Sequence, residues 1–214
     1  APTFEGVNVP SVIQKELEII NPHDQLQVKA QTTSDMAEQV VRLNPAGLSL
    51  MGTFVHYALE RYVIDKQVDI KQLWSYMVLG NPDMVSQGLS VAKWQSLYDV
   101  IEQEILETIA APSFRALFVE SQMVSTEVPV AYMRGHHLIR GVIDLLVQYH
   151  DATLFIMDYK TTVFSQTESL KASCLAQGYQ RQLAYYAQAL QALYPKHAIK
   201  KGVWLTKYRQ LVML

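Results

Sequence analysis

The stretch IRGVIDLLVQYHDATLFIMDYKTT, residues 139–162, consists of two apolar runs joined by a short polar turn, and each run contains an aspartate. Short runs rich in β-branched and aromatic residues are typical of strands, so the stretch predicts a β-hairpin. An unpaired carboxylate in a buried strand is costly. Asp144 and Asp158 therefore need a partner, and the nature of that partner bears on the function.

A three-residue turn at residues 150–152 predicts that Asp144 lies directly opposite Asp158, because opposed residues then have numbers that sum to 302. Like charges facing each other destabilise a sheet. Lys160 shares a strand face with Asp158 and supplies one positive charge. Two explanations stay open from the hairpin alone: a divalent cation between the carboxylates, or a structural Asp–Lys ion pair. The repulsion also predicts that Asp158→Ala raises the melting temperature of the metal-free protein.

The rest of the chain predicts an α/β (α+β) domain. Helices, a three-stranded antiparallel meander, a helix and a strand follow one another, which favours a mixed central sheet flanked by helices, with a further helical region towards the N-terminus. Residues 1–48 form an expected approach segment with a helical hint at residues 11–20. The expected helices are residues 49–65, 69–80, 90–111 and 168–194, and the expected strands are residues 125–133, 138–149, 153–162 and 200–208.

Composition favours a single globular domain in the cytoplasm. Half of the 214 residues are hydrophobic and 18% are charged, which argues against disorder. The sequence shows no apolar run long enough to span a membrane and no signal-peptide pattern. The net charge is −2, but seven basic residues and one acidic residue lie between residue 163 and the end. Such a basic end is typical of a surface that faces a polyanion, with a solvated tail as the alternative.

Two of the expected helices carry polar residues on one face. The segment GTFVHYALE, residues 52–60, places a glycine, a histidine and a glutamate four residues apart, and Tyr179, Gln182 and Tyr186 share a face of the later helix. Taken alone, a helical histidine is more often a packing residue than a ligand. Tyrosines at this spacing are more often part of the core.

These segments together resemble the C-terminal nuclease domain of the RecB/AddA helicase-nucleases, within the PD-(D/E)XK superfamily. The resemblance covers about residues 50–206 and rests on GTFVHYALE, RGVIDLL, IMDYKTT and YQRQLAYYAQAL in this order. It implies a restriction-endonuclease-like core and a single nuclease domain, residues 1–214, that comes from a longer helicase-nuclease. Ile143 replaces the proline of the superfamily's name, as is usual in this branch.

The resemblance also implies the roles of individual residues. His56, the two aspartates of the hairpin and the backbone carbonyl of Tyr159 are expected to bind the metal, and Lys160 is the expected catalytic lysine together with Asp144 and Asp158. Glu127, in the first strand, is expected to have a structural or supporting role. The residues expected to contact or order DNA are Gln182, Tyr186, Tyr179, Thr161 and Arg181.

The implied cofactor is Mg²⁺, with Mn²⁺ as an alternative because imidazole suits it better. Cys174 is the single cysteine, so the iron–sulfur cluster of some relatives is not expected. The implied function is a DNA exonuclease that hydrolyses phosphodiester bonds on strands fed by an ATP-dependent helicase in double-strand-break repair and recombination. The sequence contains no G-x-x-x-x-G-K-[ST] loop, so the motor is expected on another domain or subunit.

Two other functions stay open. A catalytically silent module of this fold would bind DNA or act as a scaffold, but it is expected to have lost at least one of His56, Asp144, Asp158 and Lys160, which are all present. A metal-dependent phosphohydrolase of small nucleotides is the weaker alternative, because such an enzyme has no use for a basic end.

Overall fold

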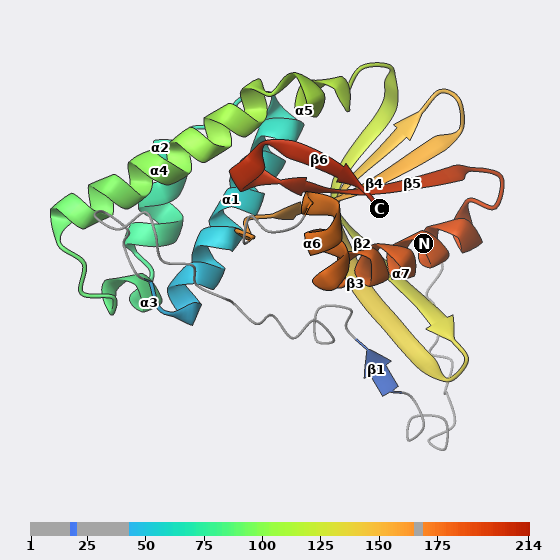
Figure 1. Cartoon of the computed structure of the whole chain (residues 1–214), viewed down its shortest axis with the longest axis horizontal. Coiled ribbons are helices and arrows are strands. Elements are labelled where there is room, and N and C mark those ends of the chain that lie inside the picture. Colours follow the sequence, from blue (N-terminus) through green and yellow to red (C-terminus); the bar gives the residue numbers. More distant parts are fainter. Residues whose placement is uncertain (1–17, 21–42, 165–168) are drawn as a thin grey trace, which may run out of the picture.

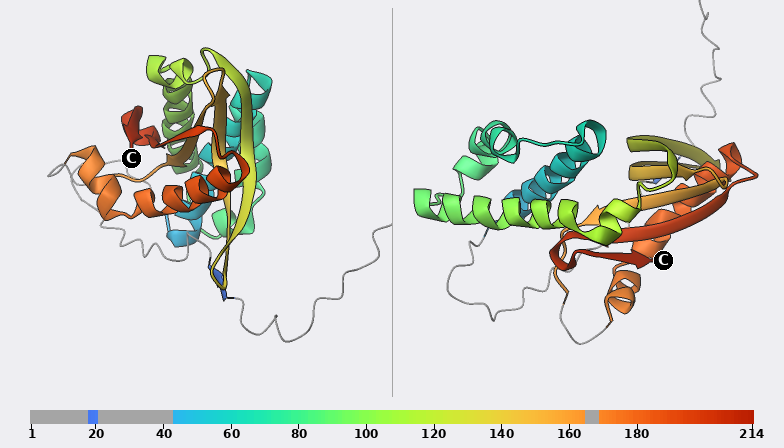
Figure 2. Two further views of the ribbon diagram at one scale, coloured as in Figure 1. Left: turned by 90° about the vertical axis from the view of Figure 1, so that its right-hand side faces the viewer. Right: turned by 90° about the horizontal axis from the view of Figure 1, so that it is seen from above.

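The computed structural model has a mixed six-stranded β-sheet with helices on both faces (Figure 1, Figure 2). The structure describes residues 18–20, 43–164 and 169–214. The helices are α1 (Pro45–Asp65), α2 (Ile70–Trp74), the π-helix η2 (Ser75–Leu79), α3 (Pro82–Val85), α4 (Val91–Ala110), α5 (Pro112–Ala116), α6 (Leu170–Ala176), α7 (Tyr179–Leu193) and the 3₁₀ turn η3 (Thr206–Tyr208). The strands are β1 (Glu18–Ile20), β2 (Ser121–Arg134), β3 (His137–Tyr149), β4 (Thr153–Lys160), β5 (Ala198–Leu205) and β6 (Gln210–Met213).

The strand order is β1-β3-β4-β5-β6, and β2 pairs with β3. β4 and β5 run parallel, whereas β2–β3, β3–β4 and β5–β6 are antiparallel pairs. The restriction-endonuclease-like mixed sheet predicted from the sequence is thereby confirmed. β2 and β3 continue beyond β4, β5 and β6 as a ribbon (Figure 1), and β1 pairs in parallel with the start of β3 at the end of that ribbon. None of the helices in the described part of the chain has the length and apolar character needed to cross a membrane.

The register of the β3–β4 hairpin is the predicted one. Leu145 faces Met157, and the next three pairs towards the turn keep numbers that sum to 302. The pairing ends at Leu145 and Met157, although β3 stays paired to β2 on its other side. The strands β3 and β4 therefore diverge at the level of Asp144 and Asp158.

The faces of β3 exchange at Asp144. Side chains two apart on a strand normally share a face, yet Ile143 packs in the core beside α7 and Leu145 packs in the core beside α1 and α4. On the neighbouring strand, Glu127 has a φ of 49°, which is uncommon for a residue other than glycine. Val128 pairs with Ile143, so the register places Glu127 opposite Asp144. The exchange of faces in β3 and the unusual backbone of Glu127 in β2 therefore occur at the same level of the sheet. Asp144 lies between the core on one face and the core on the other.

Each face of the sheet buries its own core. On one face, side chains of the helices α1, α2, α4 and α5 form a core with Trp204 of β5. Phe114 and Trp74 belong to this core, and the ring centroids of Phe114 and Trp204 lie 5.0 Å apart. On the other face, α6 and α7 cover Leu154 and Ile156 of β4. Alternate residues of β4 are thus buried on both faces, which explains why its sequence is almost continuously apolar.

Two predictions of secondary structure are corrected, and one strand was missed. The helix predicted at residues 168–194 is two helices, because Gly178, with φ 76°, separates α6 from α7 in a conformation that glycine adopts readily. β6 was not predicted. The helical hint at residues 11–20 is strand β1 at Glu18–Ile20, and its remainder lies outside the described residues.

Two residues of the basic end fasten the β5–β6 turn to α4. Lys207 forms an ion pair with Glu104, and Arg209 forms one with Glu107. These two cations are therefore neutralised within the domain. They do not contribute to a polyanion-facing surface in this structure.

Lys207→Ala is expected to lower the free energy of unfolding by about 2 kcal/mol, because it leaves the buried carboxylate of Glu104 without its cation. Arg209→Ala is the matched control, since Arg209 and Glu107 are both exposed enough for water to replace the contact, and a much smaller loss is expected. Urea denaturation of the two variants measures the difference. Equal losses would contradict the unequal burial of the two pairs.

Candidate active site

Four predicted site residues come together where β3 and β4 diverge. Asp144 belongs to β3, Asp158 and Lys160 to β4, and His56 to α1. The Nζ of Lys160 lies 2.5 Å from Oδ2 of Asp158, and Nδ1 of His56 lies 3.4 Å from Oδ2 of Asp144. The backbone amide of Tyr159 donates a hydrogen bond to Asp144 Oδ2 at 2.8 Å. His56, Asp144, Asp158 and Lys160 are called the aspartate site below.

The aspartate site is buried and combines two carboxyl groups with one lysine ammonium. The Asp158 side chain is 2% exposed, and those of Asp144 and Lys160 are each 13% exposed. Burial raises the pKa of Asp144 well above its ordinary value, and the charge on Asp158 raises it further. Burial alone would lower the pKa of Lys160, but its contact with Asp158 raises it, so the side chain is an ammonium at neutral pH. One cation therefore faces two carboxylates.

The carboxylates of Asp144 and Asp158 can provide part of the ligand set of a hard divalent cation. Asp144 and Asp158 provide oxygen ligands, which Mg²⁺ prefers, and Mg²⁺ commonly keeps several waters, so two carboxylates suffice to hold it. Among the residues that the structure describes, no three His, Cys, Asp or Glu side chains converge closely enough to hold a metal ion. His56 lies beside Asp144, and its role as a metal ligand stays a prediction. The role of the Tyr159 carbonyl stays a prediction.

The α7 residues expected to contact DNA are buried and instead hold members of the aspartate site. Gln182 Nε2 donates hydrogen bonds to Asp158 Oδ1 at 3.1 Å and to the Tyr186 hydroxyl at 3.2 Å. The Nζ of Lys160 lies 4.9 Å from the centre of the Tyr179 ring, a cation–π contact. The three side chains are at most 4% exposed. The arrangement supports a positioning role for these side chains, and their contact with DNA stays a prediction.

The other residues expected to contact DNA remain accessible. Thr161 is half-buried directly after Lys160, and Arg181 is exposed at the start of α7. Lys200, another residue of the basic end, pairs with Phe155 near the hairpin turn, about 16 Å along β4 from the level of Lys160. Only part of the basic end thus lies near the aspartate site.

Comparison with known families agrees with this arrangement. A family model described as the PD-(D/E)XK nuclease superfamily matches residues 30–211. The chain belongs to this superfamily. Membership implies a metal-dependent nuclease, because PD-(D/E)XK nucleases generally use divalent metal ions. It confirms the superfamily predicted from the sequence, whereas the RecB/AddA branch stays a prediction.

Comparisons with individual proteins give little more. No curated protein matches the chain. Of the solved structures, the protein VC1899 from Vibrio cholerae is 14% identical over 61% of this chain, with a TM-score of 0.24, and the chain spans 38% of VC1899. The structure of SSO0001 is 12% identical over 99% of this chain and 78% of its own, with a TM-score of 0.29.

The close contact between Gly141 and Tyr186 explains why the residue three positions before Asp144 is a glycine. A Cβ atom at Gly141 would lie 2.4 Å from Cε1 and 2.8 Å from the hydroxyl of Tyr186. Real Cβ atoms essentially never come that close to another heavy atom. The ring of Tyr186 therefore lies directly against the backbone of β3, and its hydroxyl reaches Gln182, which holds Asp158.

Gly141→Ala is expected to lower the free energy of unfolding by about 1 to 3 kcal/mol, since the added methyl group overpacks the contact with Tyr186. Cleavage should also fall, because a displaced Tyr186 no longer supports Gln182. Gly52→Ala is the control: its Cβ would lie an ordinary 3.6 Å from Thr161, and alanine within a helix gains up to about 1 kcal/mol over glycine. Thermal denaturation and cleavage assays compare the two variants, and similar behaviour would refute the steric argument.

Two carboxylates beside the aspartate site extend its negative charge. Burial raises the pKa of Glu127, and the charges of Glu60 and Asp158 raise it further. The expected supporting role of Glu127 is consistent with its place opposite Asp144. Sequence reasoning assigned no role to Glu60, although the helical spacing put it on the same face as His56. Its proximity to Glu127 depends on how α1 packs on the sheet.

Proposed function

We propose that the chain is a Mg²⁺-dependent deoxyribonuclease of the RecB/AddA type. On this proposal it is one domain of a longer protein, and it acts as an exonuclease on strands delivered by an ATP-dependent helicase during double-strand-break repair. Superfamily membership supports phosphodiester hydrolysis. The RecB/AddA assignment is supported by the ordered motifs of α1, β3, β4 and α7.

The observation that carries the proposal is the position of Lys160. It lies at the end of β4, where β3 and β4 diverge, and it contacts the buried Asp158. Asp144 and Asp158 are the residues next to the last pair of the hairpin, and both aspartates are largely buried. A purely structural ion pair needs one carboxylate. Burial and then the charge of Asp158 raise the pKa of Asp144, so the second carboxylate adds an electrostatic cost, and a nuclease has a use for this carboxylate.

Each residue has a distinct task in hydrolysis. Bound Mg²⁺ supplies positive charge next to the scissile phosphate and an acidified water. Asp144 and Asp158 would hold the ion, and the Tyr159 amide and Gln182 fix the orientation of the two carboxylates. The ammonium of Lys160 stabilises the negative charge that develops on the phosphate and orients the attacking water.

DNA approaches from the exposed side of the aspartate site. Thr161 and Arg181 supply a hydroxyl group and a guanidinium for phosphate oxygens, contacts that add affinity without reading the sequence. Gln182 and Tyr186 act behind the site. Their buried hydrogen bonds keep Asp158 in place while the strand moves past.

Incubation of the chain with end-labelled single-stranded, linear duplex and circular duplex DNA tests the proposal. We expect cleavage of the linear substrates with Mg²⁺, no cleavage with EDTA, and circles that stay intact because an exonuclease requires an end. Labels at the 5′ and 3′ ends give the polarity. Asp158→Asn is the negative control for a contaminating nuclease.

Binding of DNA without cleavage at any metal concentration would instead favour a silent module. Cleavage of circles would retain the nuclease and reject the exonuclease assignment. Hydrolysis confined to mononucleotides would reject DNA as the substrate.

A further inference from the structure

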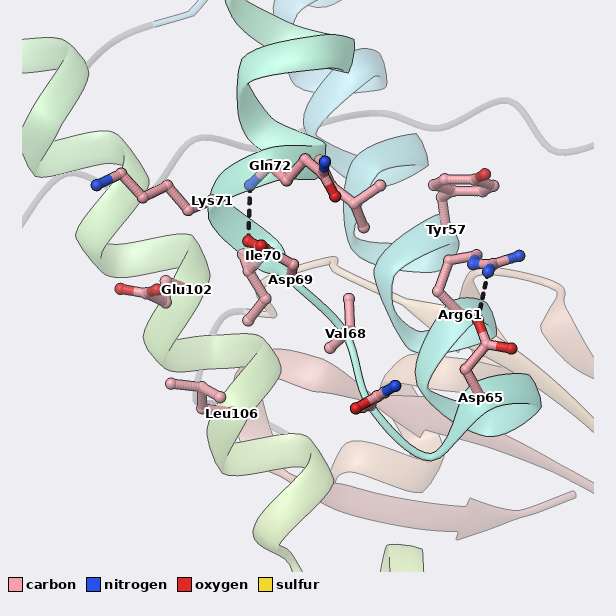
Figure 3. Close-up of a pocket in the computed structure, with 12 residues that line it drawn as sticks. Tyr57, Arg61, Asp65, Val68, Asp69, Ile70, Lys71, Gln72, Glu102 and Leu106 are labelled. Atoms are coloured by element: carbon pink, nitrogen blue, oxygen red, sulfur yellow. Dashed lines mark hydrogen bonds and ion pairs between the residues drawn. The ribbon is translucent and has the colours of Figure 1, made fainter.

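Two hollows adjoin on the outer side of the helices α1, α2 and α4, and no residue of the aspartate site lines either of them. The first, of about 1110 Å³, lies between these three helices (Figure 3). The second, of about 590 Å³, lies between α2, η2 and α4. Lys71 and Glu102 line both hollows, so the two are neighbours. Together they are called the α4 groove, whose lining includes Tyr57, Lys71, Leu79, Val91, Glu102 and Leu106.

Helix α4 forms a wall along the whole α4 groove. Val91, Gln95, Tyr98, Glu102 and Leu106 are three or four residues apart and line one hollow or the other, so they follow one side of the helix. The first and last of them are fifteen positions apart, which corresponds to about 22 Å along the helix axis.

The two ends of the α4 groove are apolar and exposed. At one end, Val91 is 85% exposed and Leu79 is 49% exposed. At the other end, Leu106 is 50% exposed, and Tyr57 of α1 is 38% exposed. Large apolar side chains that line a concave surface and remain in water are typical of a protein interaction site.

The middle of the α4 groove is acidic. Tyr98 donates a hydrogen bond to Glu102 at 2.5 Å. Burial raises the pKa of Tyr98, and the charges of Glu102, Asp69 and Asp99 raise it further, which places three carboxylates around one phenol group. These carboxylates lie between the two apolar ends.

The cations in the lining do not balance this charge. Arg61 is ion-paired with Asp65 on α1 (Figure 3). Lys71 is the other cation of the lining, set against the three carboxylates that surround Tyr98. The phosphates of a nucleic acid would be repelled here, whereas a basic polypeptide would be attracted.

We propose that the α4 groove docks an amphipathic helix of a partner protein, in which basic residues lie between two apolar anchors. A helix of about 15 residues spans the distance between the apolar ends. Its anchors fill the two hollows, and its lysine or arginine side chains face the acidic middle. Recognition of this kind follows the helix-in-groove mode, with anchors repeated along one face of the bound helix.

Selection of random 18-residue peptides on the intact immobilised chain tests the docking site. Enriched peptides are labelled, and their binding is measured by fluorescence anisotropy at low salt. Asp99→Asn with Glu102→Gln removes two charges from the groove. Val100→Lys with Gln103→Lys is the matched control, because it changes the net charge equally at two α4 positions that line neither hollow. Leu106→Ser tests an apolar anchor.

The enriched peptides should combine basic residues with apolar residues at helical spacing. We expect their dissociation constants to rise at least tenfold with the groove variant and with Leu106→Ser, and less than twofold with the control, while DNA cleavage is unchanged in all three. Failure to enrich such peptides, or equal loss in the control, would overturn the proposal. So would a homodimer that Leu106→Ser dissociates, because a second copy would then be the occupant, or tighter binding of a single-stranded oligonucleotide than of the peptides.

Discussion

Replacement of Lys160 by alanine is expected to lower DNA cleavage by about 10³-fold at saturating Mg²⁺. Removal of one group that stabilises charge in the transition state typically costs 10²- to 10³-fold in rate, and Lys160 is proposed to orient the attacking water as well. The variant should still fold, but with a lower free energy of unfolding, because the buried carboxylate of Asp158 loses its cation. Single-turnover cleavage of end-labelled DNA measures the loss, and circular dichroism checks the fold.

Lys171→Ala is the matched control, since this lysine is exposed on α6. Lys160→Arg should recover only part of the activity, because a planar guanidinium does not reproduce the compact ammonium that lies between Asp158 and the Tyr179 ring. If Lys160→Ala cleaves DNA within tenfold of the parent rate, Lys160 is a structural partner of Asp158 and not a catalytic group.

The hairpin at the centre of this fold was predictable because its signals are local. Apolar runs of strand length surround a turn, and the assumed turn length alone sets which residues face one another. The paired residues from Leu145 and Met157 towards the turn confirm that register. The helix predicted at residues 90–111 is local in the same way: its first residue, Ser90, is the N-cap of α4 and accepts a hydrogen bond from the Lys93 amide.

Features that depend on long-range packing were not predictable. The exchange of faces at Asp144 arises because β3 must contribute to two cores, and no local pattern marks it. The contact between Gly141 and Tyr186 joins residues 45 positions apart in the sequence. Helical spacing placed Gln182 and Tyr186 on one face, but it could not tell that this face turns inward to Asp158 and not outward to DNA.

The sequence also treated the two aspartates as equivalent, and the structure distinguishes them. Asp158 contacts Lys160 and accepts a hydrogen bond from Gln182. Asp158→Ala would leave a buried ammonium without its partner, which is destabilising. The structure therefore argues against the expected rise in melting temperature for this variant. Burial and then repulsion by Asp158 destabilise the charged form of Asp144, whose pKa is raised.

Asp144→Asn is accordingly expected to raise the melting temperature of the metal-free protein. Asparagine can still accept the hydrogen bond from the Tyr159 amide while it removes the charge. A carboxyl group whose pKa is higher in the folded state binds more protons there, so the stability of the parent falls as the pH rises from the unfolded pKa to the raised one. The advantage of Asp144→Asn should be small near pH 4 and largest above the raised pKa. Thermal unfolding in EDTA across this range measures it.

With divalent metal, the parent should become more stable than Asp144→Asn. Mg²⁺ or Mn²⁺ at a hundred times its dissociation constant stabilises a folded protein by about 2.7 kcal/mol if it binds only the folded state. The parent should gain this amount, Asp144→Asn should gain almost none, and His56→Ala should gain an intermediate amount. Because substrate phosphate normally completes the Mg²⁺ shell, the titration must reach millimolar metal and include a non-cleavable oligonucleotide. If saturating metal stabilises the parent and Asp144→Asn equally, or neither, Asp144 is not a metal ligand. Its opposition to Asp158 would then have only a structural cause.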